Sequence, residues 1–406
     1  MTDYKALYAE KLISAEELAK QVESGWILGM DTAPSQAPAI MNAIAARVKS
    51  SDIKGVQVQT LLDAYPFEFY TDPDMFGKMT GYSWFSSGYA RKAINGGWAD
   101  LLPTYYRDIP RHIRAEYEYD AFCIEVSPMD SHGYFSLALN GSYAEAMIDK
   151  AKRVFVEVNE NQPRCLCGTQ LHVSQVDAIV EYNHELPVLP PVAIDEVSQT
   201  IGNLIAEQIP DGACIQLGIG AIPDATGMAL KSKHDLGIHT EMFTDSMVEL
   251  IECGAVNNSK KQIHRGKSVT TFAYGSKRIY DYVDDNPAIE ILPVDYVNNP
   301  EVICKNDNMI SINAAIEVDF FGQVCAESVG TKHMSGSGGQ IDFVRGACQS
   351  KGGKSFIAFT STAKGGTISK IKPILTPGAV CTTSKNDVDY IVTEYGIAHM
   401  RGRSLG

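Results

Sequence analysis

The chain has 406 residues, of which 45% are hydrophobic and 21% charged, and its net charge at pH 7 is −14. This length exceeds what one hydrophobic core usually organises, so two domains of about 200 residues each are expected. The acidic balance and the lack of a basic segment exclude a typical nucleic-acid-binding protein, because phosphate contacts need a basic face.

The N-terminal segment MTDYKALYAEKLISAEELAKQ is charged and amphipathic and has no apolar stretch of the signal-peptide kind. No membrane-spanning run is predicted, and we expect a cytoplasmic protein without a membrane partner. The nine cysteines are an odd number without disulfide-framework spacing, which favours reduced thiols. Cys165 and Cys167 form a C-x-C pair, but no second pair of ligands lies at metal-binding spacing, so two small thiols are favoured and no metal is predicted.

One pattern from the first half returns in the second half. Residues 23–48 predict a helix end, an apolar strand, a Gly/Pro loop and a helix, and residues 210–233 repeat that order. A D-x-x-G turn at Asp130 to Gly133 returns at Asp319 to Gly322. The paired segments, in order, are 23–48 with 210–233, 122–137 with 310–328, 153–160 with 354–361, and 176–182 with 388–395. Four echoes in one order predict a duplicated domain.

The predicted strands are continuous apolar runs, which is typical of mostly parallel sheets with helices on both faces. We therefore predict an α/β protein with two similar open α/β domains. Three prolines in NHELPVLPPVAIDE (183–196) indicate a linker. The predicted domains are residues 1–186 and 192–406, and a cleft between two such domains is the expected place for an active site.

The second copy contains two glycine-rich loops. LGIGAIPDA (217–225) follows a predicted strand and opens a helix, and MSGSGGQIDF (334–343) is similar. Such loops direct backbone N–H groups toward a ligand at a helix N-terminus, although glycines can also serve turns alone. The first loop nearly matches a dinucleotide-binding G-x-G-x-x-G, with Glu241 as its ribose-binding acid, but Pro223 replaces the third glycine.

Glu241 stands in DLGIHTEMFTD (235–245), between a strand expected to end near His239 and a helix expected from Met242. With an ordinary pKa of about 4.3, its carboxylate is ionised at neutral pH and can act as a nucleophile without a base. It could attack a thioester, whose thiolate leaves readily, and the thiolate could then attack the glutamyl anhydride. Such a ping-pong transfer creates two oxyanions, each needing N–H donors worth about 3 kcal/mol, and two glycine loops could supply them. His239 is interpreted as a packed strand-end side chain.

GIHTEMFTD, LGIGAIPDA, SGSGGQIDFVRGA and VTEYGIA together resemble the acetyl-CoA hydrolase/CoA-transferase family, and the resemblance extends over essentially the whole chain. It implies that Glu241 carries a glutamyl-CoA thioester. It implies that one segment lies along the CoA and supplies an oxyanion donor near Ile219, namely Gly218, Ile219, Gly220, Ala221 and Ile222. It implies that Gly338 and Gly339 supply the second oxyanion donor and that Asn298 contacts the CoA arm. Ile316 and Lys364 are implied to line the pocket, and Gln216 to form a polar wall of the acyl pocket.

Plainer roles exist for three of these residues. Asn298 could be only a turn residue, Lys364 a solvated loop charge, and Glu241 an acid favoured by a helix dipole. Our hypothesis is that residues 82–97 form the wall that selects the acyl chain.

The resemblance implies CoA transfer between a short-chain acyl-CoA, such as 4-hydroxybutyryl-CoA or butyryl-CoA, and a carboxylate such as acetate. Coenzyme A is then a substrate, no cofactor is permanently bound, and a homo-oligomer is expected. The alternatives are an acyl-CoA hydrolase using the same glutamate, a nicotinamide-dependent oxidoreductase, and a non-catalytic CoA-binding subunit. Members of the family usually continue beyond VTEYGIA with a closing helix, so the end at Gly406 is either natural or a truncation.

Overall fold

The computed structural model describes residues 3–166, 168–190 and 192–406. These residues form two compact units. Unit 1 contains the described residues of 1–104, 108–189 and 272–295, and unit 2 contains those of 105–107, 190–271 and 296–406. The units therefore follow the two predicted domains except for two short segments, Tyr105–Arg107 and Phe272–Asp295, which each belong to the other unit.

Local hydrogen bonds account for this exchange. The Ala273 N–H donates to the Leu139 carbonyl at 2.8 Å within unit 1, and the Tyr106 N–H donates to the Gly338 carbonyl at 3.3 Å within unit 2. Neither segment belongs to the repeated pattern, so the sequence contained no signal for the exchange.

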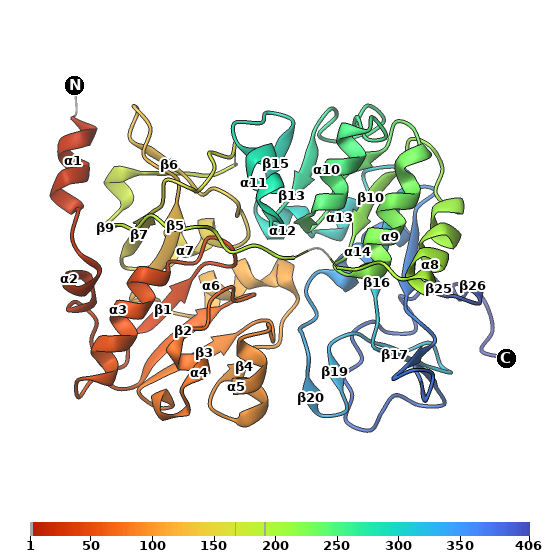
Figure 1. Ribbon diagram of the computed structural model, residues 1–406, viewed down its shortest axis with the longest axis horizontal. Helices are drawn as coiled ribbons and strands as arrows, with labels where there is room; N and C mark the ends of the chain where they lie inside the picture. The colour runs from red at the N-terminus through yellow and green to blue at the C-terminus, as the bar shows by residue number, and fades with distance from the viewer. Residues whose placement is uncertain (1–2, 167, 191) are drawn as a thin grey trace. The chain divides into compact units, whose positions relative to one another are not determined.

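Unit 1 is built on a seven-stranded sheet in the order β4-β3-β2-β1-β5-β7-β9, and all its neighbouring strands are parallel (Figure 1). The strands are β1 (Ile27–Met30), β2 (Val56–Thr60), β3 (Met79–Ser83), β4 (Asp100–Leu101), β5 (Ala121–Val126), β6 (Tyr134–Ser136), β7 (Val154–Val158), β8 (Gln170–His172), β9 (Ala178–Glu181), β14 (Phe272–Ala273) and β15 (Ile289–Ile291). The helices are α1 (Tyr4–Lys11), α2 (Ala15–Ala19), α3 (Pro38–Lys49), α4 (Glu68–Thr71), α5 (Ala90–Gly96), α6 (Ile109–Glu116), α7 (Ala144–Lys150) and α11 (Lys277–Val283), and α12 (Val294–Val297) spans the boundary to unit 2.

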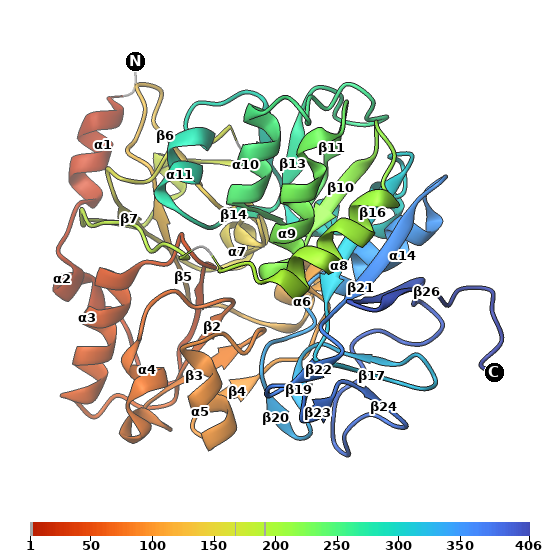
Figure 2. The ribbon, with the colours of Figure 1, turned by 45° about the vertical axis from the view of Figure 1, so that its right-hand side comes forward.

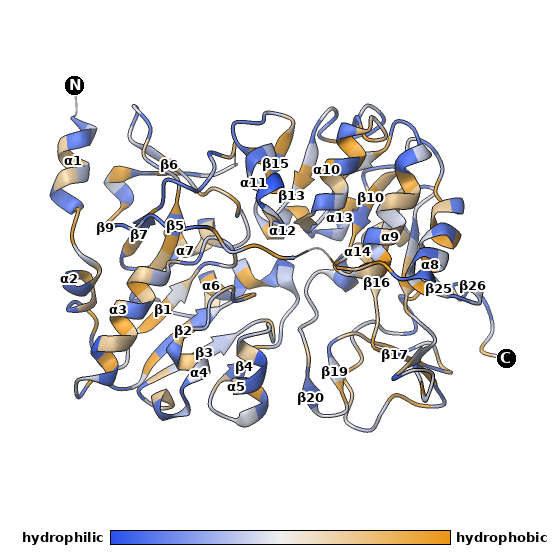
Figure 3. Ribbon diagram, viewed as in Figure 1, coloured by the Kyte–Doolittle hydropathy of each residue, from blue (hydrophilic) through white to orange (hydrophobic). Residues whose placement is uncertain are grey.

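Helices cover both faces of this sheet. Leu28 and Met30 of β1 belong to one buried cluster with Ile40 and Ile44 of α3. Gly29 faces the opposite side of the sheet, where the Met147 side chain of α7 leaves no room for a Cβ atom. All six residues of β5 are buried, in agreement with its hydrophobic colouring (Figure 3).

Unit 2 is built on a six-stranded sheet in the order β11-β10-β16-β21-β25-β26, which is parallel except for the last pair (Figure 2). The strands are β10 (Cys214–Leu217), β11 (Gly237–Ile238), β12 (Met242–Phe243), β13 (Ser268–Thr270), β16 (Met309–Ala314), β17 (Glu317–Asp319), β18 (Val324–Cys325), β19 (Ser328–Val329), β20 (Lys332–His333), β21 (Lys354–Ala358), β22 (Thr362–Ala363), β23 (Ile368–Ser369), β24 (Ile371–Lys372), β25 (Tyr390–Thr393) and β26 (Gly396–His399). The helices are α8 (Glu196–Glu207), α9 (Ala221–Ala229), α10 (Asp245–Glu252), α13 (Pro300–Ile303) and α14 (Gln340–Gln349).

The predicted duplication is confirmed by the order of the strands. Each repeated segment supplies one strand of a main sheet, and the four strands β1-β5-β7-β9 of unit 1 lie in the same order as β10-β16-β21-β25 of unit 2. The two D-x-x-G turns also match, because Asp130 and Asp319 both accept two backbone N–H bonds and Gly133 and Gly322 have φ values of 84° and 85°. The fold is thus the predicted pair of open α/β domains.

Unit 2 adds features that the repeats did not predict. Strand β26 pairs antiparallel with β25, and the small sheet β18-β17-β24 and the hairpins β19-β20 and β22-β23 lie between the main strands in sequence. Among the described residues, no helix combines the length and the apolarity needed to cross a membrane.

Candidate active site

Several predicted site residues of unit 2 lie at one edge of its sheet. Glu241 follows β11, the loop Gly218 to Gly220 follows β10, and Ala315 and Ile316 follow β16. Because these strands are parallel neighbours, their carboxyl ends lie at the same edge. The chain leaves β10 toward β11 on one side and β16 toward β21 on the other, which makes β10 and β16 the switch point where open α/β sheets bind ligands.

The segment around Glu241 differs in one detail from the prediction. Met242 and Phe243 form the short strand β12, and helix α10 begins only at Asp245. The apolar spacing after Glu241 therefore indicated a helix three residues too early, because two adjacent apolar residues in a strand cannot be distinguished from the start of a helix. The backbone carbonyl of Glu241 accepts bonds from the Thr270 hydroxyl at 2.8 Å and the Thr271 N–H at 3.0 Å, which fix the peptide after the carboxylate.

The carboxylate of part-buried Glu241 lies among polar hydrogens. The Asn298 side-chain Nδ2 donates to its Oε2 at 2.6 Å, and the backbone N–H of Gly339 also hydrogen-bonds to the carboxylate. Asn298 is fully buried, and its Oδ1 atom has no hydrogen-bond partner in the described part of the chain. The structure therefore joins three predicted site residues, and it shows that Asn298 contacts the glutamate itself.

Glycine is required at position 339. A Cβ atom there would overlap both Oε2 of Glu241 and Nδ2 of Asn298. Gly339 is the N-cap of α14, and the preceding Gly338 has a φ of 50°, a left-handed conformation that favours glycine. The SGSGG loop thus ends at a helix N-terminus, where the N–H of the N-cap residue Gly339 interacts with the carboxylate.

Burial raises the pKa of Glu241 to about 7, while the hydrogen bonds from Asn298 and Gly339 act in the opposite direction. This corrects the expectation of an ordinary carboxylate that is almost wholly ionised at neutral pH. The desolvated carboxylate is a stronger base and nucleophile than a surface glutamate, and its ionised form needs the two donors.

His239 is a structural residue, as predicted. Its ring is buried, and Nε2 lies 2.8 Å from the Val297 carbonyl oxygen. Burial and the nearby Lys261 charge lower the pKa of His239 to about 3, so the ring is neutral near pH 7 and holds the Asn298 segment against the strand that leads to Glu241.

The first glycine loop has one engaged and one available backbone N–H. The Gly218 N–H donates to the Ile312 carbonyl at 2.8 Å, whereas the Ile219 N–H has no partner among the residues described. Gly220 has a φ of 121° and caps α9, and the Ile219 side chain is 53% exposed. The donor that the sequence placed near Ile219 is therefore available there. Ala221 and Ile222 begin helix α9, where first-turn N–H groups have no helical partner.

A cavity lies beside this loop, between the ends of β10, β16 and β21. Its lining includes Ile219, Ala221, Ala315, Phe359 and Lys370. The Lys370 Nζ lies 5.4 Å from the centre of the Phe359 ring and forms no ion pair with any described residue. Burial lowers the pKa of Lys370, and the Glu394 charge opposes this shift. Sequence reasoning missed Lys370, since nothing in TISKIK distinguishes it from a surface lysine.

The remaining predicted residues have less direct positions. Lys364 is exposed, with a φ of 51°, in the turn between β22 and β23, and it does not line this cavity. Ile316 is part-buried, and its N–H donates to the Cys325 carbonyl. The buried Gln216 side chain hydrogen-bonds to Ser311 and Asn313 on the neighbouring strand, so its role in an acyl pocket stays a prediction.

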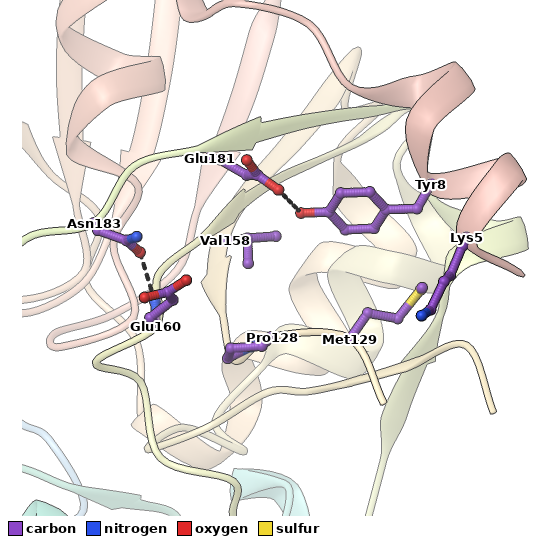
Figure 4. Close-up of a pocket in the computed structure, with 8 residues that line it drawn as sticks. All are labelled: Lys5, Tyr8, Pro128, Met129, Val158, Glu160, Glu181 and Asn183. Atoms are coloured by element: carbon purple, nitrogen blue, oxygen red, sulfur yellow. Dashed lines mark hydrogen bonds between the residues drawn. The ribbon is translucent and has the colours of Figure 1, made fainter. Parts of the chain in front are cut away.

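Unit 1 contains polar groups that were not predicted. Glu125, Glu157 and His184 have ligand atoms within 4.8 Å of one another, and His184 Nε2 lies 2.6 Å from Glu125 Oε2. Figure 4 shows a second feature, a pocket in which Tyr8 donates to Glu181 at 2.7 Å and the Asn183 side chain accepts from the Glu160 N–H at 2.8 Å. None of its lining residues was predicted as a site residue. Of the C-x-C pair, Cys165 is buried and Cys167 lies outside the described residues.

The dinucleotide alternative is weakened by what surrounds the acid. The neighbouring strand β11 is where a ribose-binding acid would also stand, so position alone does not separate the two readings. The Glu241 carboxylate, however, is enclosed by Gly339 and Asn298 from a second loop, which a dinucleotide site does not require.

Two protein-family models together match most of the chain. Residues 1–190 match the acetyl-CoA hydrolase/transferase N-terminal domain, and residues 275–406 match the acetyl-CoA hydrolase/transferase C-terminal domain. The chain is 46% identical to a succinyl-CoA:cyclohexane-1-carboxylate CoA transferase of Geobacter metallireducens, over 99% of this chain and 91% of the relative. It is 44% identical to a 4-hydroxybutyrate coenzyme A transferase of Clostridium kluyveri, over 99% and 94%.

A solved structure, RipA from Yersinia pestis, is similar with a TM-score of 0.94 and 38% identity, covering 99% of this chain and 93% of that one. The citrate lyase alpha subunit of Streptococcus mutans, at 17% identity and a TM-score of 0.71, shares the fold. The chain belongs to the acetyl-CoA hydrolase/transferase family.

Proposed function

We propose that this protein is a CoA-transferase that moves coenzyme A from a short-chain acyl-CoA to a second carboxylate through a thioester on Glu241. The observation that carries the proposal is the carboxylate of Glu241, which is desolvated and held by Asn298 Nδ2 at 2.6 Å and by the Gly339 N–H. Three relatives at 39–46% identity are named as CoA transferases of carboxylic acids, which supports the same reaction class.

The first step is attack by a Glu241 oxygen on the carbonyl carbon of the acyl-CoA. The C–S bond breaks, CoA leaves as a thiolate, and an acyl–glutamyl anhydride forms. The thiolate then attacks the glutamyl carbonyl, releases the original acid as a carboxylate, and leaves CoA on Glu241 as a thioester. A second carboxylate reverses both steps and leaves as the new acyl-CoA.

Each step places negative charge on a different carbonyl oxygen. In the proposal, the Gly339 N–H and Asn298 serve the oxygen that belongs to Glu241, because they already contact its carboxylate. The Ile219 N–H, which lacks a partner in the described chain, serves the oxygen of the acyl group. Preset donors of this kind contribute about 3 kcal/mol each to the transition state.

Coenzyme A is proposed to lie along the first glycine loop. The cavity beside it combines the N-terminus of α9 with Lys370, and both favour a phosphate group. The unpartnered Oδ1 of Asn298 could accept an amide N–H of the pantetheine arm, which would retain the predicted contact to the CoA arm. An acidic protein needs such local donors to hold an anionic ligand.

The acyl group is proposed to be short, with 4-hydroxybutyrate or butyrate and acetate as the first acids to test. Relatives named for these acids include the 4-hydroxybutyrate coenzyme A transferase at 44% identity and a butyryl-CoA:acetate CoA-transferase of Anaerostipes caccae at 39%. Hydrolysis differs only in that water replaces the second acid at the glutamyl thioester. Loss of butyryl-CoA that requires added acetate supports transfer, whereas equal loss without acetate supports hydrolysis.

Mass spectrometry after incubation with butyryl-CoA tests the covalent step. A CoA-sized adduct is expected on the peptide that contains Glu241 and is expected to disappear when acetate is added. Glu241→Gln should abolish both adduct and turnover while preserving the fold, and Glu301→Gln, at an exposed glutamate, should do neither. A Glu241→Gln protein that still transfers CoA would refute the proposal. If neither the wild type nor the variant forms an adduct, a CoA-binding subunit would be favoured.

A further inference from the structure

A segment of the N-terminal half takes part in unit 2 beside the second glycine loop. Residues Tyr105–Arg107 belong to unit 2, although they precede the linker by many residues. The Tyr106 N–H donates to the Gly338 carbonyl oxygen at 3.3 Å. One residue further, Arg107 Nε lies 3.3 Å from Oδ1 of Asp342, in the first turn of α14.

These contacts act on the peptide group that faces the catalytic glutamate. The Gly338 carbonyl oxygen and the Gly339 N–H belong to the same planar peptide unit. Tyr106 therefore holds one side of the unit whose other side hydrogen-bonds to Glu241. A hydrogen bond to the carbonyl oxygen both fixes the orientation of the plane and polarises the N–H on the opposite side.

The ion pair keeps this segment in place. Asp342 is fully buried and the Arg107 side chain is 25% exposed, so the pair is shielded from water on the aspartate side. The Arg107 guanidinium also lies 5.9 Å from the centre of the Tyr105 ring, which restricts the same segment from its other end. A buried carboxylate at the start of a helix is favoured by the helix dipole and by a cation beside it.

We propose that Tyr106 and Arg107 are positioning residues that orient the Gly339 N–H as the oxyanion donor for the Glu241 carbonyl. The inference rests on the proposed glutamyl-CoA mechanism and adds to it a clamp made by the N-terminal half. The three residues that cross into unit 2 make both contacts of this clamp, the backbone bond of Tyr106 to Gly338 and the ion pair of Arg107 with Asp342.

The test replaces the ion pair without leaving a buried charge. The double variant Arg107→Met/Asp342→Asn removes both charged groups, and the matched control Arg164→Met/Asp130→Asn removes an ion pair of unit 1 with a contact of 3.1 Å. Steady-state kcat and KM for butyryl-CoA and acetate, and the pH profile of kcat/KM, are measured for both. The unfolding temperature of each variant is measured alongside.

The clamp variant should lose about tenfold in kcat with KM for butyryl-CoA changed less than about threefold, because the donor acts mainly on the transition state. The acid limb of its pH profile should move to higher pH, since a misplaced donor stabilises the Glu241 carboxylate less. The control should keep both wild-type values. Arg107→Lys should recover much of the activity because it restores the positive charge.

Wild-type kcat and pH profile in the clamp variant would overturn the inference. If the double variant does not fold, the single isosteric variant Asp342→Asn replaces it in the test. Its kcat and pH profile should change in the same direction, and wild-type values would overturn the inference. Failure of the proposed function is distinguishable, because the wild-type protein itself would then form no CoA adduct on Glu241.

Discussion

Nδ2 of Asn298, between α12 and α13, lies 2.6 Å from Oε2 of Glu241, which follows strand β11. Burial raises the pKa of Glu241 to about 7, and this hydrogen bond is the strongest effect that opposes the rise. The pair therefore sets the fraction of the Glu241 carboxylate, the proposed nucleophile, that is ionised at physiological pH.

The first prediction is a pH dependence of the first half-reaction. Because the attacking carboxylate must be ionised, kcat/KM for butyryl-CoA should fall by about tenfold per pH unit below a midpoint near pH 7. It should reach a plateau above pH 8 or so, where the carboxylate is ionised. Initial rates between pH 5 and 9 at saturating acetate check this. A profile that stays flat down to pH 5 would mean that the nucleophile has an ordinary pKa.

Asn298→Ala provides the control for this assignment. It removes the donor that lowers the pKa of Glu241, so the midpoint should move to higher pH and the plateau rate should drop. The neighbouring Asn299 is the N-cap of α13, and its side chain accepts the Glu301 N–H at 2.9 Å. Asn299→Ala should cost about 1 kcal/mol of stability without moving the midpoint of the pH profile.

The second prediction concerns the close approach at Gly339. Gly339→Ala should reduce kcat by about a hundredfold or more, since its Cβ would displace the Glu241 carboxylate and the Asn298 amide together. The backbone at Gly339 has a φ of −100°, which alanine adopts without strain, so the unfolding temperature should change little. Gly406→Ala, at a glycine with no atom within 4 Å of an added Cβ, should keep wild-type activity. Equal activity of the two variants would contradict the placement of Gly339.

The fold and the central acid were predictable because both leave periodic or local signals. The four repeated segments predicted four neighbouring strands in each sheet, since an apolar run and a turn recur even when side chains change. Glu241 was identified from its junction and its motif. The contact between Asn298 and Glu241, by contrast, joins residues 57 positions apart and depends on how two loops meet, which no local pattern encodes.

The same limit applies to the missed residues. Lys370 was overlooked in favour of Lys364 because both lie in one hairpin segment, and only the packing against Phe359 turns Lys370 toward the cavity. Tyr106 and Arg107 were overlooked because three residues that cross between units have no repeated partner. The short strand β12 escaped prediction since two residues have no measurable period.

The third prediction separates the two lysines. Lys370→Met should raise KM for butyryl-CoA by about fivefold to tenfold and leave KM for acetate unchanged, because only the CoA substrate carries phosphates. Lys364→Met, at an exposed turn, should raise KM for butyryl-CoA less than Lys370→Met does. Both KM values at low and moderate salt check this. A larger effect for Lys364 would restore the choice made from the sequence.

The fourth prediction concerns unit 1 and pH-dependent stability. Both oxygens of the fully buried Glu157 accept N–H bonds at the start of α3, from Ala39 at 3.2 Å and Ile40 at 2.9 Å. Burial, and then the Glu125 charge, raise the pKa of Glu157 to about 8, although these N–H groups and His184 oppose the rise. Burial acts to lower the pKa of His184, but the hydrogen bond to Glu125 and the Glu125 charge outweigh it and raise that pKa.

Both shifts have the same consequence for stability. The folded state keeps protons on Glu157 and His184 that the unfolded chain releases at lower pH, so the free energy of unfolding should fall as pH rises from about 5 to 9. Glu157→Gln removes one of these protons, and its unfolding free energy relative to wild type should therefore improve by about 2 kcal/mol between pH 6 and 9. It should start below wild type at pH 6, because the amide offers one acceptor where the carboxyl group offers two.

Urea unfolding of wild type, Glu157→Gln and Glu160→Gln at both pH values measures this difference. Glu160 follows the same strand but is exposed, so its variant should show no pH-dependent gain. A constant difference between Glu157→Gln and wild type would mean that Glu157 is already ionised at pH 6.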